Sequence, residues 1–291
     1  MTRPPAGPPI APGAGPGARA RRSAPERAAP LPGPPALVAR PPALRRRLLR
    51  VYDRLHRRYG AQRWWPARSR FEVVVGAILT QNAAWRNVEA AIGRLRAAGA
   101  LHPAALRALP RRRLEALVRP SGTFRVKAAR LHAFVRHLAR HHDGRLGRLL
   151  AMPLAELRAE LLGVPGIGRE TADAIALYAA GRPVFVVDAY TRRILGRHGL
   201  IPAPADYDAV QARVMAHLPH DPALFNEYHA LLVRAAKEHC RVQPRCAGCP
   251  LHGDLGGRPP RPLAPPRARS RAPGGRGAPR TGPATAPEPP A

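Results

Sequence analysis

A tight turn between two helical runs constrains this chain more than any other feature of its sequence. The turn reads VPGIG at residues 164–168 and lies inside an otherwise helical stretch over residues 161–199. Its glycines, Gly166 and Gly168, can adopt backbone angles closed to other residues, so the chain can reverse within a few residues. The next helix, expected over residues 169–180, points free backbone N–H groups and the positive end of its dipole outward. The pattern therefore predicts a helical hairpin that binds an anion such as a phosphate.

An aspartate follows the hairpin at the point where an apolar segment meets the next helix. Asp188 comes eighteen residues after Glu170, at the end of the sequence Val-Val-Asp. Backbone N–H groups at a helix start hold such a carboxylate ionised. A glycine turn alone is most often structural, and an aspartate at a helix start is most often only a cap. The two together, at this distance, are far more specific.

The charge of the chain indicates a polyanionic partner. The net charge is +31, and the two ends account for +12 of it, because residues 1–45 and 256–291 each hold seven arginines and one acidic residue. A central region this basic favours DNA or RNA as the partner. The alternative is a bias toward arginine codons, since only 2 of the 49 basic residues are lysines, Lys127 and Lys237. Such a bias does not by itself suppress aspartate and glutamate.

The two ends differ from the middle in composition. Residues 1–45 hold 13 prolines and residues 256–291 hold 11, with few large apolar side chains, so both are expected to be disordered tails. No run of 18 apolar residues and no hydrophobic signal segment occurs, which predicts neither a membrane span nor secretion. All three cysteines lie within ten residues, a metal-ligand pattern rather than a disulfide framework. We expect a cytoplasmic, nucleoid-associated monomer.

Apolar periodicity predicts an all-α protein. The segment FEVVVGAILTQ, residues 71–81, is apolar on nearly all sides and is preceded by Ser69, a capping residue. Its β-branched run also suits a strand, but no alternating strand partners lie nearby, so a buried helix is favoured. The expected helices cover residues 44–59, 71–81, 85–98, 103–109, 111–118, 124–139, 153–162, 169–180, 188–198, 206–217 and 221–238.

The motif PGIGRETAD at residues 165–173, followed by Val-Val-Asp188, resembles the helix-hairpin-helix (HhH-GPD) DNA glycosylases of the endonuclease III superfamily. The resemblance extends from about residue 64 to residue 251. It implies that Asp188 is catalytic, and that the hairpin binds the backbone of double-stranded DNA containing a damaged base. The hairpin residues are Gly166, Ile167, Gly168, Arg169, Glu170 and Thr171.

The resemblance also implies the architecture, which periodicity alone does not. We expect a six-helix module at 68–182 that carries the hairpin. A second helical domain would combine 46–67 with 183–255, and a DNA-binding cleft would lie between the two.

One hairpin position separates the branches of this superfamily. Bifunctional members have a lysine where this chain has Glu170, and the lysine amine attacks the sugar and leads to strand cleavage. The chain therefore resembles a monofunctional glycosylase without AP lyase activity. The phrase GIGRETAD is similar to the 3-methyladenine glycosylases related to endonuclease III, which implies an alkylated base excised in base excision repair. A glycosylase for another lesion and a non-catalytic DNA-binding protein are the alternatives.

The same resemblance implies a pocket for the flipped base. Its aromatic residues would be Trp64, Trp65 and Trp85, since a cationic base stacks well on an aromatic face. Gln81 resembles the residue that fills the gap left in the duplex. Lys237 loosely matches a pocket lysine of the subgroup. Without the resemblance, ordinary packing residues and a solvated lysine would be the simpler interpretations.

The cysteines Cys240, Cys246 and Cys249 resemble the [4Fe-4S] loop of the superfamily, which uses four cysteines. The fourth would fall near Leu255, where this chain has none. His252 is a possible substitute, and the set Cys-x5-Cys-x2-Cys-x2-His also suits zinc. The run of His141, His142 and Asp143 lies at an expected helix end, where histidines are ordinary, and no role is assigned to it.

Overall fold

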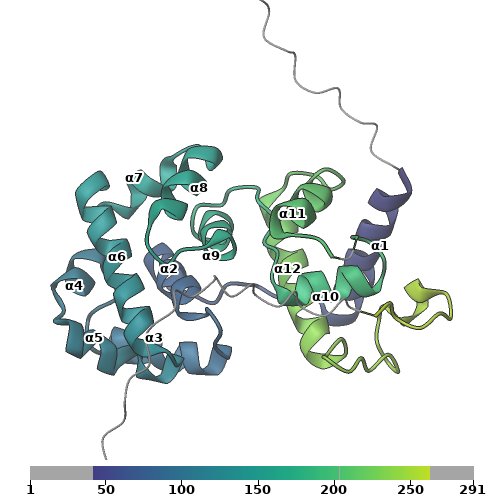
Figure 1. Ribbon diagram of the computed structural model, residues 1–291, viewed down its shortest axis with the longest axis horizontal. Helices are drawn as coiled ribbons and strands as arrows, with labels where there is room; N and C mark the ends of the chain where they lie inside the picture. Colours follow the sequence, from purple (N-terminus) through teal and green to yellow (C-terminus); the bar gives the residue numbers. More distant parts are fainter. Residues whose placement is uncertain (1–41, 203, 263–291) are drawn as a thin grey trace, which may run out of the picture. The chain divides into compact units, whose positions relative to one another are not determined.

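The computed structural model describes residues 42–202 and 204–262 (Figure 1). Within these ranges all regular structure is helical, and the only β-type pairing is one isolated bridge between Cys240 and Pro244. The predicted all-α class is confirmed. The tail predictions for residues 1–41 and 263–291 lie outside the described residues. Of the helices that the structure describes, none is long and apolar enough to cross a bilayer.

The first half of the described chain forms six α-helices and one 3-10 turn. Their bounds follow the predicted ones closely, and the first begins inside the stretch assigned by composition to the N-terminal tail. They are α1 (Pro42–Tyr59), α2 (Arg70–Leu79), α3 (Trp85–Ala97), α4 (Pro103–Ala108), α5 (Arg111–Val118), the 3-10 turn η1 (Arg119–Ser121) and α6 (Phe124–His142). Helix α2 begins where Ser69 predicted, because the Ser69 hydroxyl accepts a hydrogen bond from the backbone N–H of Glu72 at 3.1 Å.

The second half contains the hairpin and the C-terminal helices. The elements are α7 (Leu146–Ala151), α8 (Leu154–Gly163), α9 (Arg169–Ala174), the π-helical segment η2 (Ile175–Ala179), α10 (Ala189–Arg197), α11 (Tyr207–Met215), α12 (Pro222–Glu238) and the 3-10 turn η3 (His252–Leu255). Two features differ from the sequence-based expectation: α7 was not predicted, and the helix expected over 169–180 changes to a π-helix after Ala174. The wider π turn occurs where the hairpin helix packs against α2.

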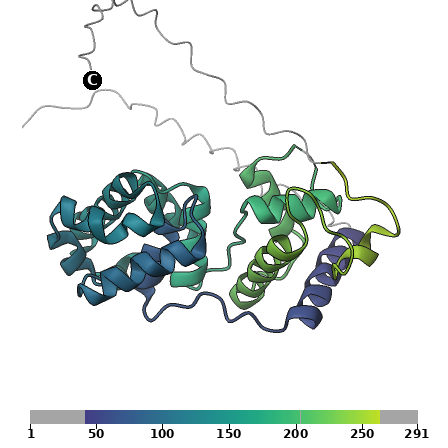
Figure 2. The same cartoon turned by 90° about the horizontal axis from the view of Figure 1, so that it is seen from below.

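The helices pack in two groups that share no strand or sheet. Helices α2–α9 pack with one another, and α12 packs against α1 and α10 (Figure 1). Residues 60–69 and 180–188 run between the two groups (Figure 2). Helix α2 is at the centre of the first group, because every residue from Phe71 to Leu79 is buried. Helix α12 also contacts η2, so the segment that follows the hairpin lies against the second group.

A buried lysine fixes the C-terminal end of α2. Lys127 on α6 is 1% exposed, and its ammonium donates hydrogen bonds to the carbonyl oxygens of Leu79, at 2.7 Å, and of Ser121. Burial lowers the pKa of Lys127, and the nearby Arg130 guanidinium adds to this effect. A compact ammonium on a flexible stem fits this narrow space, which a planar guanidinium does not. Lys127 is therefore a structural residue that positions the loop carrying Gln81.

A buried carboxylate ties the hairpin to α11. Asp173, the last residue of the motif, is fully buried and accepts hydrogen bonds from Arg158, Tyr207 and Gln211, each at 2.8 Å. Arg158 lies on α8, the first helix of the hairpin, so one carboxylate joins both hairpin helices to α11. The three donors satisfy the hydrogen-bonding capacity of this buried charge. Removing any one of them would destabilise the fold, because part of the charge would be neither paired nor hydrated.

Candidate active site

A pocket of about 240 Å³ opens between the hairpin helix, the loop before α2, the loop after α2 and helix α12. It contains every residue that the sequence nominated for catalysis or base binding. We call it the aromatic pocket and define it by its lining residues: Trp64, Trp65, Ala77, Thr80, Gln81, Ala83, Ala84, Trp85, Glu170, Thr171, Ala174, Tyr178, Val186, Asp188, Tyr190, His229, Val233 and Lys237.

Asp188 is the N-cap of α10 and the most buried carboxylate in the pocket. Its side chain is 12% exposed, and its Oδ1 accepts a hydrogen bond from the backbone N–H of Thr191 at 2.7 Å. Burial raises the pKa of Asp188, but the His229 imidazole and the bonds from Thr191 outweigh burial and hold the pKa below its ordinary value. The pocket therefore contains a fixed carboxylate that is ionised at neutral pH.

Two residues that the sequence did not single out support Asp188. His229 on α12 is 7% exposed, and its Nε2 lies 3.5 Å from Asp188 Oδ2. Its other ring nitrogen, Nδ1, lies 2.5 Å from the hydroxyl oxygen of Tyr178. A tyrosine hydroxyl that donates to Nδ1 leaves the Nε2 proton facing Asp188. His229 sits in the middle of an apolar helix, where nothing in the local pattern separates it from a packing histidine.

Glu170 is a second carboxylate at the edge of the pocket. Glu170 is an exposed residue that lines the pocket. Partial burial and the negative charge of Asp188 raise the pKa of Glu170 above its ordinary value. The two carboxyl groups are therefore shifted in opposite directions, and the pattern is typical of paired groups at functional sites.

Four aromatic rings form one continuous cluster in the pocket wall. Trp65 lies at its centre, with its ring centroid 5.1 Å from that of Trp85, 5.3 Å from Tyr178 and 5.6 Å from Trp64. These spacings are typical of edge-on and tilted aromatic contacts. The three tryptophans that the sequence nominated are thus in mutual contact, and Tyr178 joins them from the hairpin side.

A glycine behind this wall makes room for Trp65. A Cβ atom added to Gly76, on the buried helix α2, would lie 3.0 Å from the Trp65 ring. Gly76 does not line the pocket itself. Only a residue without a side chain lets the indole approach the helix backbone this closely.

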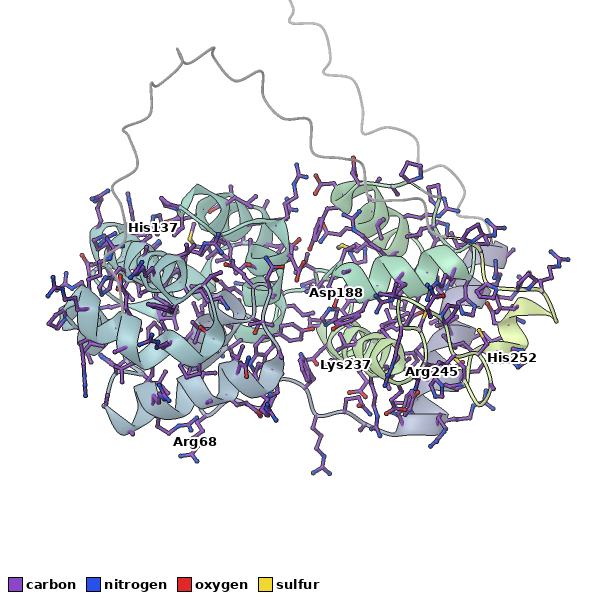
Figure 3. All side chains as sticks on the ribbon, turned by 60° about the horizontal axis from the view of Figure 1, so that its bottom comes forward. Arg68, His137, Asp188, Lys237, Arg245 and His252 are labelled. Atoms are coloured by element: carbon purple, nitrogen blue, oxygen red, sulfur yellow. The ribbon has the colours of Figure 1, made fainter. Side chains whose placement is uncertain are left out.

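Gln81 is held against the hairpin. Its side-chain nitrogen donates to the carbonyl oxygen of Gly166 at 3.1 Å and to the Thr171 hydroxyl at 2.8 Å, and its side-chain oxygen accepts from Arg130. The residue predicted to fill the gap in the duplex thus lies beside the predicted phosphate-binding turn. Lys237 is an exposed residue at the end of α12 and lines the same pocket. Figure 3 shows it close to Asp188.

The two hairpin glycines differ from each other. Gly166 has φ of +87°, as predicted, and a Cβ atom there would lie 2.4 Å from the Arg130 side chain. Gly168 was also predicted to need backbone angles closed to other residues, and this prediction was wrong. Its φ is −95° and its ψ is 178°, an extended conformation that any residue adopts. Among residues 42–202 and 204–262, no atom outside Gly168 and its two chain neighbours lies within 4 Å of a Cβ built on Gly168. The space beside Gly168 is open, whereas Gly166 is required by the backbone.

The part of the chain that forms the hairpin and most of the pocket is similar in sequence to a known superfamily of proteins. The sequence model of the HhH-GPD superfamily of base excision DNA repair proteins matches residues 75–220. The chain belongs to this superfamily. A candidate DNA repair glycosylase of Methanocaldococcus jannaschii is 41% identical over 209 residues, which are 70% of this chain and 93% of that relative.

Other members of the HhH-GPD superfamily agree in sequence and fold. Endonuclease III of Bacillus subtilis is 28% identical over 145 residues, 50% of this chain and 62% of the enzyme. A 3-methyladenine DNA glycosylase of H. pylori, bound to 1,N6-ethenoadenine, has a TM-score of 0.55 at 25% identity and covers 68% of this chain and 97% of its own. An endonuclease III–DNA complex has the same fold, with a TM-score of 0.62 at 24% identity over 72% and 94% of the two chains. The protein is a DNA glycosylase of base excision repair in the endonuclease III family, and it binds DNA.

The C-terminal loop of this glycosylase gathers its cysteines into one pocket. We call residues 240–252 the cysteine loop. Cys240, Cys246 and Cys249 line a pocket together with His252, and His239 borders it. Arg197 Nη1 donates to Cys240 Sγ at 3.2 Å. Figure 3 shows His252 and Arg245 in this region, on the side of Asp188 away from the hairpin group.

The sulfur atoms of the cysteine loop lie farther apart than the ligands of a single zinc ion. The three sulfur atoms do not all lie within 4.8 Å of one another, whereas tetrahedral zinc with bonds of 2.3 Å holds its sulfurs about 3.8 Å apart. Burial, and then the other two cysteines, raise the pKa of the Cys249 thiol. Three thiols and one imidazole face the pocket in place of the four thiols of a complete cluster loop.

Proposed function

We propose that this glycosylase is monofunctional and removes alkylated, 3-methyladenine-like bases from double-stranded DNA by hydrolysis. The observation that carries the proposal is a buried, ionised Asp188 in an aromatic pocket that receives no lysine from the hairpin helix. The H. pylori relative with the same fold is a 3-methyladenine glycosylase, which supports this substrate class.

The aromatic pocket suits a cationic base. A base alkylated on a ring nitrogen carries a positive charge, and the tryptophan faces attract cations. Extruding a damaged base costs less than extruding an intact one, so pocket shape and stacking can provide selectivity. Trp65 and Trp85 supply the stacking surfaces, and the hairpin with Gln81 holds the DNA backbone beside them.

Asp188 acts on the sugar rather than on the base. The bond between C1′ and the base nitrogen breaks, its electron pair stays on the nitrogen, and the base leaves neutral. The deoxyribose ring then carries the positive charge, which the Asp188 carboxylate stabilises electrostatically. Water adds to C1′ and gives its proton to Asp188, from which it passes to solvent, leaving an abasic site in an intact strand.

His229 is a positioning residue in this scheme. The Thr191 N–H holds one oxygen of Asp188, and the Nε2 side of His229 faces the other. Tyr178 sets the orientation of the imidazole from the opposite side. The two contacts keep the carboxylate ionised and fixed in orientation, so no reorganisation is needed when the sugar becomes cationic.

The absence of strand cleavage follows from Glu170. A carboxylate cannot form a Schiff base with the sugar, and raising its pKa does not change that. Lys237 is the only lysine among the residues that line the pocket. If Lys237 attacked C1′, the enzyme would be a glycosylase with lyase activity, which is the second candidate function.

The cysteine loop is proposed to hold the iron–sulfur cluster of the family through Cys240, Cys246, Cys249 and His252. The cluster would supply structural cohesion to the loop, with redox chemistry available to it. Arg197, beside Cys240, would balance the negative charge of the thiolates and also anchors the loop through the carbonyl oxygens of Arg241 and Val242, each at 2.6 Å.

The test is incubation of the full-length protein with methylated duplex DNA. Free 3-methyladenine is expected by chromatography, with strands that break only after alkali. Borohydride should trap no protein–DNA adduct, and the K237Q variant should release base at a similar rate. A trapped adduct that K237Q abolishes would establish the lyase alternative. Base release only from oxidised or mismatched DNA would overturn the proposed substrate class.

A further inference from the structure

A second site of converging ligand atoms lies far from the aromatic pocket, between the end of α6 and the middle of α8. Glu160 Oε1 lies 3.0 Å from His137 Nε2 and 2.6 Å from His142 Nε2. In the part of the chain that the structure describes, these residues form the one group of three histidine, cysteine or acidic side chains whose ligand atoms all lie within 4.8 Å. Figure 3 shows His137 well away from Asp188 and Lys237.

Two histidines on α6 reach the same carboxylate although they are five residues apart. Residues five apart on a helix point about 140° away from each other, so His137 and His142 do not share a face by periodicity. Helix α6 ends at His142, and Asp143 then adopts a left-handed conformation with φ of 53°. At this last turn both imidazoles reach Glu160, which is 22% exposed and projects from α8.

The atoms at this site match a transition-metal ligand set. Two imidazoles and one carboxylate are the protein ligands of many zinc sites that leave a fourth position for water. Bonds of 2.0–2.2 Å in a tetrahedron separate the ligand atoms by about 3.3 Å, slightly more than the observed 2.6 and 3.0 Å. The side chains are 17%, 11% and 22% exposed, so an ion can enter while the ligands stay held.

We propose that His137, His142 and Glu160 bind one divalent transition-metal ion, with Zn²⁺ as the reference ion. Imidazole nitrogen favours zinc, copper, nickel and cobalt over magnesium and calcium. In the metal-free protein both Nε2 atoms lie within hydrogen-bond distance of the Glu160 carboxylate. On binding, each ring carries its proton on Nδ1 and presents the Nε2 lone pair to the ion.

The ion would join the first helix of the DNA-binding hairpin to α6. Glu160 lies on α8, which leads directly into the 164–168 turn, and Arg158 on the same helix holds the buried Asp173. An ion that binds only the folded state stabilises it in proportion to its concentration above Kd. The proposed ion would therefore stabilise the packing of the hairpin against α6. This structural role does not depend on which DNA base the enzyme removes.

The experiment compares metal binding by the full-length protein and three variants. H142Q and E160Q each remove one ligand, and H141Q is the matched control, because His141 stacks on His137 at 4.5 Å but lies outside the ligand group. Each protein is stripped with a chelator and titrated with Zn²⁺ under anaerobic conditions. Wild type and H141Q should bind one equivalent more than H142Q and E160Q, or bind that equivalent at least 10-fold more tightly.

Two further measurements separate this site from the cysteine loop. Co²⁺ bound by nitrogen and oxygen gives visible bands without the near-ultraviolet sulfur-to-metal absorption that thiolates produce, so only visible bands should be lost in H142Q. Zn²⁺ should raise the Tm of wild type and H141Q by about 5 °C more than that of H142Q and E160Q. The Tm values of the metal-free proteins show whether each variant folds. If H142Q does not fold, E160Q still tests the site, because glutamine keeps a carbonyl oxygen that accepts hydrogen bonds from the histidines. Equal stoichiometry and equal affinity in all four proteins would overturn the proposal.

Discussion

The aromatic pocket and the cysteine loop assemble their functional residues in opposite ways. The pocket takes its residues from the loops on either side of α2, from the hairpin helix, and from α10 and α12, which are far apart in sequence. The proposed metal ligands of the cysteine loop all come from a single segment of thirteen residues, 240–252. The pocket is complete, whereas the loop has three thiols and one histidine.

The two regions therefore depend on the rest of the molecule to different degrees. The pocket requires the whole fold, so a fold that is preserved brings Asp188, His229 and Trp65 together. The loop requires one residue type at each ligand position, so one substitution near residue 255 changes the ligand set and leaves the fold unaltered. Single-residue variants in both regions test this difference.

The largest effect is expected from Asp188→Asn. Asparagine still caps α10 by accepting from Thr191 but cannot stabilise the cationic sugar, so base release should slow about 100- to 1,000-fold with little change in DNA affinity. Single-turnover kinetics and a binding titration measure the two effects. Asp206→Asn is the matched control, because Asp206 caps α11 through Ala209 at 2.7 Å outside the pocket. Equal rates for the two variants would remove Asp188 from the chemistry.

The next largest effect concerns the cysteine loop. Anaerobically purified protein should be brown and contain iron, and Cys246→Ser should remove most of that iron. Leu255→Cys supplies a thiol at a residue that already lines the cysteine pocket, so it should slow loss of the cluster in air. Elemental analysis and absorption spectra after air exposure test both variants. Zinc in place of iron in the wild-type protein would contradict the cluster.

A smaller effect is expected from His229→Gln. The imidazole lowers the pKa of Asp188 while burial raises it, so losing the imidazole should raise that pKa. The carboxylate would then be protonated at higher pH, and the acid limb of kcat/KM should move to higher pH. We expect a rate loss of about 10-fold at neutral pH. Tyr178→Phe keeps the imidazole and should move the limb less; a loss that is uniform across pH would indicate a packing role alone.

The smallest effects separate the two hairpin glycines. Gly166→Ala forces a side chain into a positive φ and against Arg130, so it should lower the free energy of unfolding by about 1–2 kcal/mol. Gly168→Ala should change stability by less than about 0.5 kcal/mol. If the open space beside Gly168 receives a phosphate, Gly168→Ala should still weaken binding to all sequences alike. Chemical denaturation and salt-dependent binding measure the two properties, and equal stability losses would contradict the distinction.

The helices were predictable wherever a local signal marked their ends. Ser69 and Asp188 cap α2 and α10 through their side chains, as their positions predicted. Helix α7 was missed because six residues containing Gly147 give too short a periodic signal. The π-helical segment was missed because the sequence IALYA has no local feature that distinguishes it from an α-helix; packing against α2 accompanies it.

The site was predictable only in part, and mainly through the resemblance. Periodicity did not bring Trp64, Gln81 and Lys237 to one pocket, because such convergence depends on tertiary contacts. His229 and Glu160 were missed for the same reason: each is an ordinary residue on its own helix, and its partners lie far away in sequence. The unusual lysine content did single out Lys127, which proves to be a buried structural residue.

The contact between Gly76 and Trp65 has a consequence for the evolution and engineering of substrate range. The position of Trp65, which lines the pocket, depends on its contact with Gly76 on the buried helix α2. Gly76 itself does not line the pocket. A Cβ atom at that position would lie 3.0 Å from the indole of Trp65, which lines the pocket, so the ring would have to shift by a few tenths of an ångström. Preference for larger or smaller lesions can thus change through the scaffold, and a comparison of pocket-lining residues alone would not detect it.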